Sequence, residues 1–259
     1  MIIKIPLRYA IIICIKKNSE ILTMKKFYSL VSSTKNDEGY VIQLDGKPVQ
    51  TPLKQDLVAP SQALADAIIA EWSAQGETIN PDTMPLTQTL ITAIDKIRDR
   101  EAITVGVMKY LDTDLVCYWA KKPPELAAKH KEVYGRWAKW FDEHFEVPLY
   151  TTKKIEALKQ DEEAHKRAWN YIEALDDYYF TVLHILTSLT GSIIVSLAFC
   201  EGDITPEETF EVVKLDELFK SEIYNEDVHG AAPQEEAERE HLKKELAAAQ
   251  QFLDLVNAE

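Results

Sequence analysis

The stretch that decides the fold class is Tyr40-Val41-Ile42-Gln43-Leu44-Asp45-Gly46-Lys47-Pro48-Val49-Gln50-Thr51, in the first quarter of a chain of 259 residues. Two β-prone segments flank Asp45-Gly46, a pair that tolerates the positive φ angles of a tight hairpin turn. Pro48 cannot donate a backbone hydrogen bond, so it belongs at a strand start or at a sheet edge. The stretch therefore predicts a β-hairpin within a small sheet.

Downstream of the hairpin the hydrophobic pattern becomes helical. Ser61 is suited to cap a helix on which Leu64, Ile68 and Trp72 share one face. Trp72 is most simply a core residue of that helix. Helical periods then dominate from Leu86 to the end of the chain.

These patterns predict an α+β fold, with a small N-terminal β-rich domain followed by a larger all-helical C-terminal domain. We place the β-rich domain, which includes one helix, at residues 24–85 and the helical domain at residues 86–259. Residues 1–23 form an uncertain N-terminal extension, too short to span a bilayer and without a small-residue cleavage site. A mis-called start, with Met24 the real beginning, is one explanation, and a transit peptide is another.

One segment of the helical region, residues 178–200, contains no Asp, Glu, Lys or Arg and is long enough to suggest a membrane span. Thr181, His184, Ser188 and Ser192 repeat within it at helical spacing and form a polar seam. A buried helix with satisfied hydroxyl groups explains this seam better than stable membrane insertion.

The charge of the chain is acidic and unevenly distributed. The formal net charge is −14, and residues 201–259 hold 17 acidic and 5 basic side chains, a net charge of −12. Such a segment repels nucleic acid and anionic lipid and suits a basic or amphipathic protein partner. A solvated face that favours solubility is the alternative interpretation.

No motif in the sequence predicts a catalytic site or a cofactor site. The chain has no P-loop, dinucleotide fingerprint, nucleophile elbow or HExxH pair. Cys14, Cys117 and Cys200 are scattered, without metal-ligand or disulfide spacing, which favours a reducing compartment. We therefore expect no enzyme activity, no cofactor, no metal site and no small-molecule substrate.

The best candidate for enzymatic chemistry is Asp112-Thr113-Asp114. In an extended segment the two carboxylates would point to the same side and could bind a hard cation, as in a metal-dependent hydrolase. No third ligand stands at a convincing spacing. We therefore prefer the interpretation in which Asp112 or Asp114 caps a helix end or pairs with a base.

A second group of acidic residues lies on a helix expected at residues 206–224, before a last helix at roughly residues 233–256. Its apolar stripe consists of Val212, Leu215, Phe219 and Ile223. Glu222 falls on the edge of this stripe and needs a partner, because burying a lone carboxylate is costly. Asp216 and Glu217 are expected to project into solvent or toward a partner.

Several ordered blocks resemble the ATP12 family, which are assembly chaperones for the F1 part of ATP synthase. The blocks are Leu44-Asp45-Gly46-Lys47-Pro48-Val49-Gln50-Thr51-Pro52, Glu71-Trp72, Gln75-Gly76-Glu77, Met84-Pro85-Leu86-Thr87, Thr92-Ala93-Ile94-Asp95, Asp112-Thr113-Asp114-Leu115-Val116-Cys117-Tyr118, Leu215-Asp216-Glu217-Leu218-Phe219 and Glu222-Ile223-Tyr224. Trp72, Asp112 and Asp114 are signature residues within them. The resemblance covers about residues 26–255. It departs from the family at Lys220, Tyr224, Tyr134 and Gly135-Arg136.

The resemblance implies a chaperone that binds the unassembled α subunit of F1 and prevents its aggregation until the β subunit competes for it, without nucleotide. It places partner contacts at Asp216, Glu217, Glu222 and Tyr224. Family members occur in mitochondria and in α-proteobacteria, and because the N-terminus does not match a transit peptide we expect the cytoplasm of an α-proteobacterium, with the mitochondrial matrix as the alternative. A helical scaffold for another client is the remaining alternative function.

Overall fold

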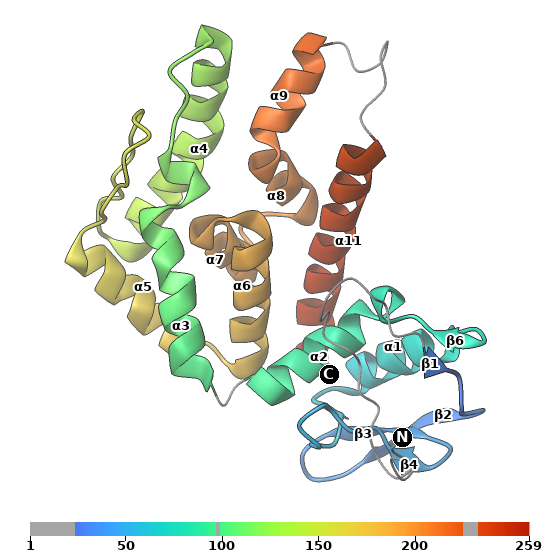
Figure 1. Cartoon of the computed structure of the whole chain (residues 1–259). Helices are drawn as coiled ribbons and strands as arrows, with labels where there is room; N and C mark the ends of the chain where they lie inside the picture. The colour runs from blue at the N-terminus through green and yellow to red at the C-terminus, as the bar shows by residue number, and fades with distance from the viewer. Residues whose placement is uncertain (1–23, 97–98, 225–232, 259) are drawn as a thin grey trace, which may run out of the picture. The chain divides into compact units, whose positions relative to one another are not determined.

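The computed structural model describes residues 24–96, 99–224 and 233–258 (Figure 1). They form two compact units. Unit 1 comprises the described residues of Met1–Arg98 and of Gln251–Glu259, and unit 2 comprises those of Asp99–Gln250. Small antiparallel sheets precede a largely helical region, so the predicted α+β fold class is confirmed.

Unit 1 is built around an antiparallel sheet in which β2, β3 and β4 lie in that order and β5 also pairs with β3. A separate two-stranded sheet is formed by β1 and β6. The strands are β1 (Met24–Lys25), β2 (Val31–Lys35), β3 (Tyr40–Leu44), β4 (Lys47–Pro48), β5 (Val58–Ala59) and β6 (Thr78–Ile79). The predicted hairpin joins β3 to β4 through Asp45 and Gly46, whose φ angles are 50° and 75°. Asp45 also fixes the preceding chain, because its carboxylate accepts hydrogen bonds from the Ser29 and Leu30 amides.

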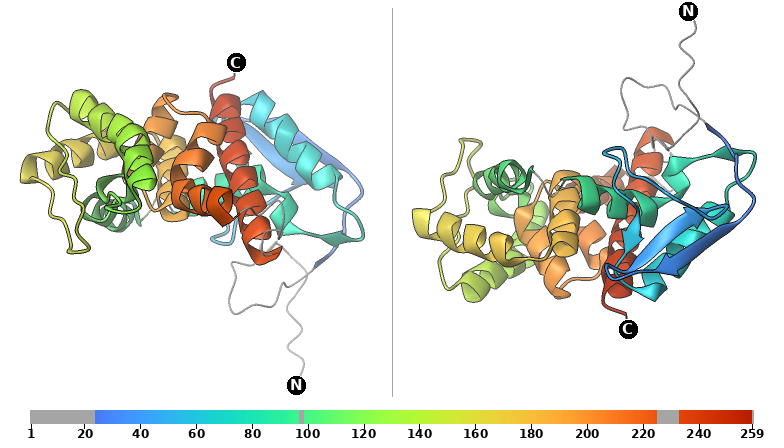
Figure 2. Two further views of the ribbon diagram at one scale, coloured as in Figure 1. Left: turned by 90° about the horizontal axis from the view of Figure 1, so that it is seen from above. Right: turned by 90° about the horizontal axis from the view of Figure 1, so that it is seen from below.

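Helix α1 (Gln62–Ser73) contacts β2 and β3, and Figure 2 shows it beside the strands of the sheet. Ser61 caps it as predicted, accepting a hydrogen bond from the Leu64 amide. Helix α2 (Pro85–Lys96) packs on α1 and follows a short 3-10 helix, Pro81–Thr83. The domain boundary was expected after residue 85, at the start of α2. In the structure α2 belongs to unit 1, and unit 2 begins at Asp99.

Unit 2 is helical. Its elements are α3 (Arg100–Met108), the 3-10 helices η3 (Lys109–Asp112) and η4 (Leu115–Cys117), α4 (Pro124–Phe145), α5 (Glu162–Ala174), α6 (Asp177–Thr190), α7 (Ile193–Glu201), α8 (Pro206–Val213), α9 (Leu215–Tyr224) and most of α11 (Pro233–Val256). Helix α7 is buried along its whole apolar length, from Ile193 to Cys200. It packs against α6, α4 and α8 and forms the core of this unit.

Two helices predicted to be continuous are each divided. The charge-free segment at residues 178–200 forms α6 and α7, because Gly191 adopts a φ of 71° that ends α6 and Ser192 caps α7. The segment at residues 206–224 forms α8 and α9, separated at Lys214. Gly191 therefore has a helix-capping role.

Candidate partner-binding site

Helix α9 carries the predicted partner-binding carboxylates. Its apolar side is held in unit 2 by Leu215 and Phe219, both buried. Asp216 and Glu217 stand in its first turn, where negative charge is favoured by the helix dipole. Each of the three predicted carboxylates, Asp216, Glu217 and Glu222, has an ion-pair or hydrogen-bond partner in the structure.

Asp216 is held by a buried histidine of α4. The amide of Ala120 donates to Nδ1 of His130 over 2.9 Å, so that the proton of a neutral ring sits on Nε2. This nitrogen lies 3.1 Å from Oδ1 of Asp216, to which it donates. The side chain of Asp216 remains 51% exposed. One side of its carboxylate is fixed and the other is open to solvent.

Glu222 pairs with the neighbouring residue of α4. Nζ of Lys129 lies 2.7 Å from Oε2 of Glu222 and 5.3 Å from the centre of the Phe219 ring. The Glu222 side chain is 62% exposed, so it stands on the surface beyond the edge of the apolar stripe. Ile223 is 59% exposed, although it was predicted as part of that stripe. The buried apolar face of α9 ends before Ile223, because the helix itself ends one residue later.

Glu217 takes its partners from within the acidic segment. Its carboxylate lies 2.7 Å from Nζ of Lys214 and 3.8 Å from Nε of Arg239 on α11. The Glu217 side chain is 43% exposed. Tyr224 is the last residue of α9, and its side chain lies outside the described residues. The three carboxylates and Ile223 together make the surface that we name the α9 patch.

Trp72 lies in unit 1 and has a structural role. Its side chain is fully buried, as predicted. Its ring packs edge-on against Tyr28 with the centroids 5.6 Å apart, and its carbonyl accepts a 2.7 Å hydrogen bond from the Tyr28 hydroxyl. The adjacent Glu71 caps α2, accepting hydrogen bonds from the Leu86 and Thr87 amides, each over 2.8 Å. This signature block therefore joins α1 to α2.

Asp114 is fully buried and caps two helices of unit 2. It accepts hydrogen bonds from the amide of Val116 at 3.0 Å, from the amide of Ile194 at 3.0 Å and from the hydroxyl of Ser192 at 2.7 Å. Desolvation raises the pKa of Asp114 to about 6, against the opposing effect of these hydrogen bonds. The preferred interpretation, a helix-capping aspartate, is confirmed.

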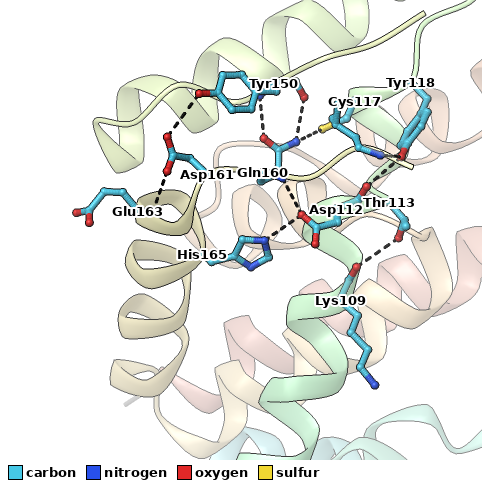
Figure 3. Close-up of polar contacts among 11 residues, drawn as sticks. Lys109, Asp112, Thr113, Cys117, Tyr118, Tyr150, Gln160, Asp161, Glu163 and His165 are labelled. Carbon is cyan, nitrogen blue, oxygen red and sulfur yellow. Dashed lines mark hydrogen bonds and ion pairs between the residues drawn. The ribbon is translucent and has the colours of Figure 1, made fainter. Parts of the chain in front are cut away.

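Asp112 is engaged separately, as Figure 3 shows. Its Oδ1 accepts a 2.8 Å hydrogen bond from the amide of Gln160 and lies 2.9 Å from Nε2 of His165. Asp112 ends η3 and Asp114 caps η4, so the extended segment needed for a shared cation is not formed. Among the described residues, no three His, Cys, Asp or Glu side chains are grouped to hold a metal ion.

No local sequence pattern predicts the role of Gln160, which is buried and closes a loop. Its Oε1 accepts from the amide of Tyr150 at 2.8 Å, and its Nε2 donates to the carbonyl of Tyr150 at 2.9 Å (Figure 3). Tyr118 contributes as well, since its hydroxyl accepts from the Leu158 amide at 3.0 Å. Asp112 and Tyr118 thus belong to a signature block that holds the base of this loop.

Cys117 and Cys200 are free and buried, consistent with their scattered spacing. Burial raises the pKa of the Cys117 thiol and raises that of Cys200 to about 12, so neither is a ready nucleophile. In the part of the chain that the structure describes, no helix has both the length and the apolar character needed to cross a membrane.

Comparison with known proteins points to one family. The family model described as ATP12 chaperone protein matches residues 25–142. Protein atp12, mitochondrial, of Schizosaccharomyces pombe is 26% identical over 234 residues, which cover 84% of this chain and 78% of that protein. The crystal structure of Atp12 from Paracoccus denitrificans superimposes with a TM-score of 0.81 at 30% identity, covering 90% of this chain and 98% of that one. The Atu1473 protein from Agrobacterium tumefaciens gives a TM-score of 0.80 at 33% identity, with coverages of 91% and 87%.

Proposed function

The chain belongs to the ATP12 family of chaperones, and from that premise we propose that it binds the unassembled α subunit of F1 ATP synthase and prevents its aggregation. An orphan subunit exposes an interface with an apolar core, which invites aggregation. A chaperone that covers this interface needs a complementary surface with a polar rim and no turnover chemistry. Competition by the β subunit would release the client without nucleotide.

The observation that carries the proposal is the α9 patch. Its carboxylates pair with Lys129, His130, Lys214 and Arg239, yet their side chains remain 43% to 62% exposed. The Lys129–Glu222 pair is exposed and therefore weak, so a basic side chain of a client can compete for the Glu222 carboxylate at little cost. The exposed Ile223 adds apolar area beside them.

The decisive experiment is an aggregation assay on the purified α subunit without ATP. We expect the equimolar protein to suppress light scattering by the α subunit as it is diluted from denaturant. Unchanged scattering at that dose would remove the α subunit as client. A pull-down from cell extract that recovers another protein and no ATP synthase subunit would favour the alternative of a helical scaffold.

Replacing Glu222 tests the α9 patch itself. Glu222→Ala removes one exposed carboxylate, and we expect binding of the α subunit to weaken about three- to tenfold with the fold unchanged. Glu211→Ala on α8 is the matched control, since Glu211 is also an exposed glutamate of the acidic segment. Equal affinities of the two variants would show that Glu222 has no special part in binding.

We further propose the cytoplasm of an α-proteobacterium as the compartment, with the mitochondrial matrix as the alternative. The two bacterial structures are 30% and 33% identical to this chain, and the mitochondrial relative is 26% identical, which supports the order of preference. Fluorescence microscopy or fractionation of tagged protein in its native cells tests it. Recovery with mitochondria would reverse the order.

A further inference from the structure

A loop of unit 2 combines a rigid base with a basic and apolar tip. It comprises residues 151–159, between Tyr150 and Gln160, and we name it the basic loop. Figure 1 shows it in yellow, extending from the start of α5. Compact loops whose ends are held together are frequently functional.

The base of the basic loop is closed by hydrogen bonds from distant parts of unit 2. Besides the contacts of Gln160 with Tyr150, the amide of Thr152 donates to the Cys117 carbonyl and the amide of Trp119 donates to the Thr152 carbonyl, both over 2.8 Å. The Asp112 carboxylate and the Tyr118 hydroxyl hold the other strand of the base at Gln160 and Leu158, as described above. The base is therefore fixed on both sides by residues 112–119.

The tip of the basic loop is exposed and positively charged. Residues 153–159 include three lysines and one glutamate, within a chain whose net charge is −14. Lys154 lies 3.7 Å from Glu156, and among the described residues Lys153 and Lys159 have no ion-pair partner. Ile155 has a relative exposure of 101%, the highest of the exposed large apolar side chains in the described part of the chain.

Acidic residues follow the tip of the basic loop in the sequence. Asp161, Glu162 and Glu163 follow at the start of α5, where Asp161 caps the helix and Glu163 pairs with Arg167 over 2.9 Å. An acidic protein gains nothing in solubility from a fully exposed isoleucine between Lys154 and Glu156. A partner surface with negative charge and a small apolar depression would contact both the lysines of the tip and Ile155.

We propose that the basic loop is a docking surface for an acidic, partly apolar surface of a protein client, which, if the proposed function holds, belongs to the α subunit of F1. Charge complementarity selects this occupant, because Lys153, Lys154 and Lys159 offer donors to carboxylates around a central Ile155. Anionic lipid is disfavoured by the overall charge of −14 and by the single apolar side chain at the tip. The α9 patch would then bind basic side chains of the client, and the basic loop would bind acidic ones.

The test uses the full chain with two probes. One is the purified α subunit, and the other is a short labelled peptide of glutamate and leucine, read by fluorescence anisotropy. The variant Lys153→Glu/Lys159→Glu reverses the charge of the tip, and Ile155→Ser removes its apolar side chain. The matched control is Lys131→Glu/Lys244→Glu, which reverses two exposed lysines on α4 and α11.

We expect the charge reversal at the tip to weaken binding of both probes about tenfold, and Ile155→Ser about threefold, while the control changes affinity less than about twofold. Melting temperatures should stay within about 2 °C of the unmodified protein, because only exposed tip side chains change. Tip-dependent binding of the peptide with no binding of the α subunit would support the basic loop and reject the α subunit as client.

Three results would overturn the proposal. The first is equal affinity of the unmodified protein and the tip variants for every probe that binds, or no binding of either probe. The second is a dimer in sedimentation velocity that the reversal dissociates, which would assign the basic loop to a second copy of the chain. The third is binding to phosphatidylserine vesicles that the reversal abolishes, which would assign it to a membrane surface.

Discussion

At the scale of single residues, the family signature is mostly structural. Asp45 holds a turn, Glu71 caps α2, and Asp95 accepts a 2.6 Å hydrogen bond from the hydroxyl of Thr51. Asp114 caps η4 and α7. These acidic side chains are directed at backbone amides and hydroxyl groups of their own chain. The signature therefore identifies the fold, whereas the α9 patch and the basic loop offer the exposed chemistry.

Asp114 should make stability depend on pH. Its pKa rises from 3.8 in the unfolded chain to about 6 in the folded protein. Its contribution is therefore fully present below about pH 4 and is lost as the pH rises through about 6, a change of roughly 3 kcal/mol. Other groups titrate in the same range, so the measurement is the difference in unfolding free energy between the unmodified protein and Asp114→Asn.

That difference should fall by roughly 3 kcal/mol between pH 4 and pH 7 in urea titrations. The asparagine also turns an amide group toward the donors that surround Asp114, which should cost about 1–3 kcal/mol at any pH. A difference that stays constant across the range would show that burial does not control ionisation of this carboxyl group.

Trp72 offers a test of the core of unit 1. Trp72→Ala should lower the unfolding free energy by about 3–5 kcal/mol, because it leaves a cavity beside Tyr28. The indole Nε1 is buried and has no hydrogen-bond partner among the described residues. Trp72→Phe should cost less than the alanine variant, because it removes the same unsatisfied donor but keeps an aromatic ring that fills most of the cavity. An unchanged midpoint of Trp72→Ala in chemical denaturation would refute the core assignment.

At the scale of elements, local signals could be predicted and long-range closures could not. The Asp45-Gly46 turn and the Ser61 cap are encoded within a few residues, and both are confirmed. The division at Gly191-Ser192 was missed because a charge-free segment looks continuous by hydropathy, although Gly followed by Ser matches a helix end and a new cap. The closure at the base of the basic loop joins Gln160 to Asp112 and Tyr150, and Leu158 to Tyr118, and no local pattern reveals it.

Gln160 should control the base of the basic loop. Gln160→Ala leaves the half-buried backbone N–H and C=O of Tyr150 without their side-chain partner, at a cost of about 1–3 kcal/mol. Trypsin should then cleave faster after Lys153 and Lys154, measured by mass spectrometry under native conditions. Thr151→Ala is the control, because Thr151 is exposed and belongs to the same loop. Equal cleavage rates in the two variants would mean that Gln160 does not hold the loop.

At the scale of the whole molecule, most of the net negative charge is concentrated in one segment of the chain. Residues 201–259 carry a net charge of −12 out of −14, and they include the α9 patch. The basic loop is a small positive site that precedes them in the chain. A protein that lacks a recognisable catalytic motif, yet separates its charges in this way, is suited to recognising another protein surface. Charge complementarity of this kind mainly raises the association rate with the client and orients the client as it binds.

Association with the α subunit should therefore slow as salt is added. The Debye length falls from about 30 Å at 0.01 M to about 10 Å at 0.1 M salt, so long-range attraction by the acidic segment is screened. We expect the association rate to fall about tenfold over this range while the dissociation rate changes less than about twofold, measured by stopped-flow fluorescence. Sucrose in place of salt is the control for changes in the solvent. If dissociation accelerates while association stays constant, the acidic segment acts through close contacts in the complex and does not steer the encounter.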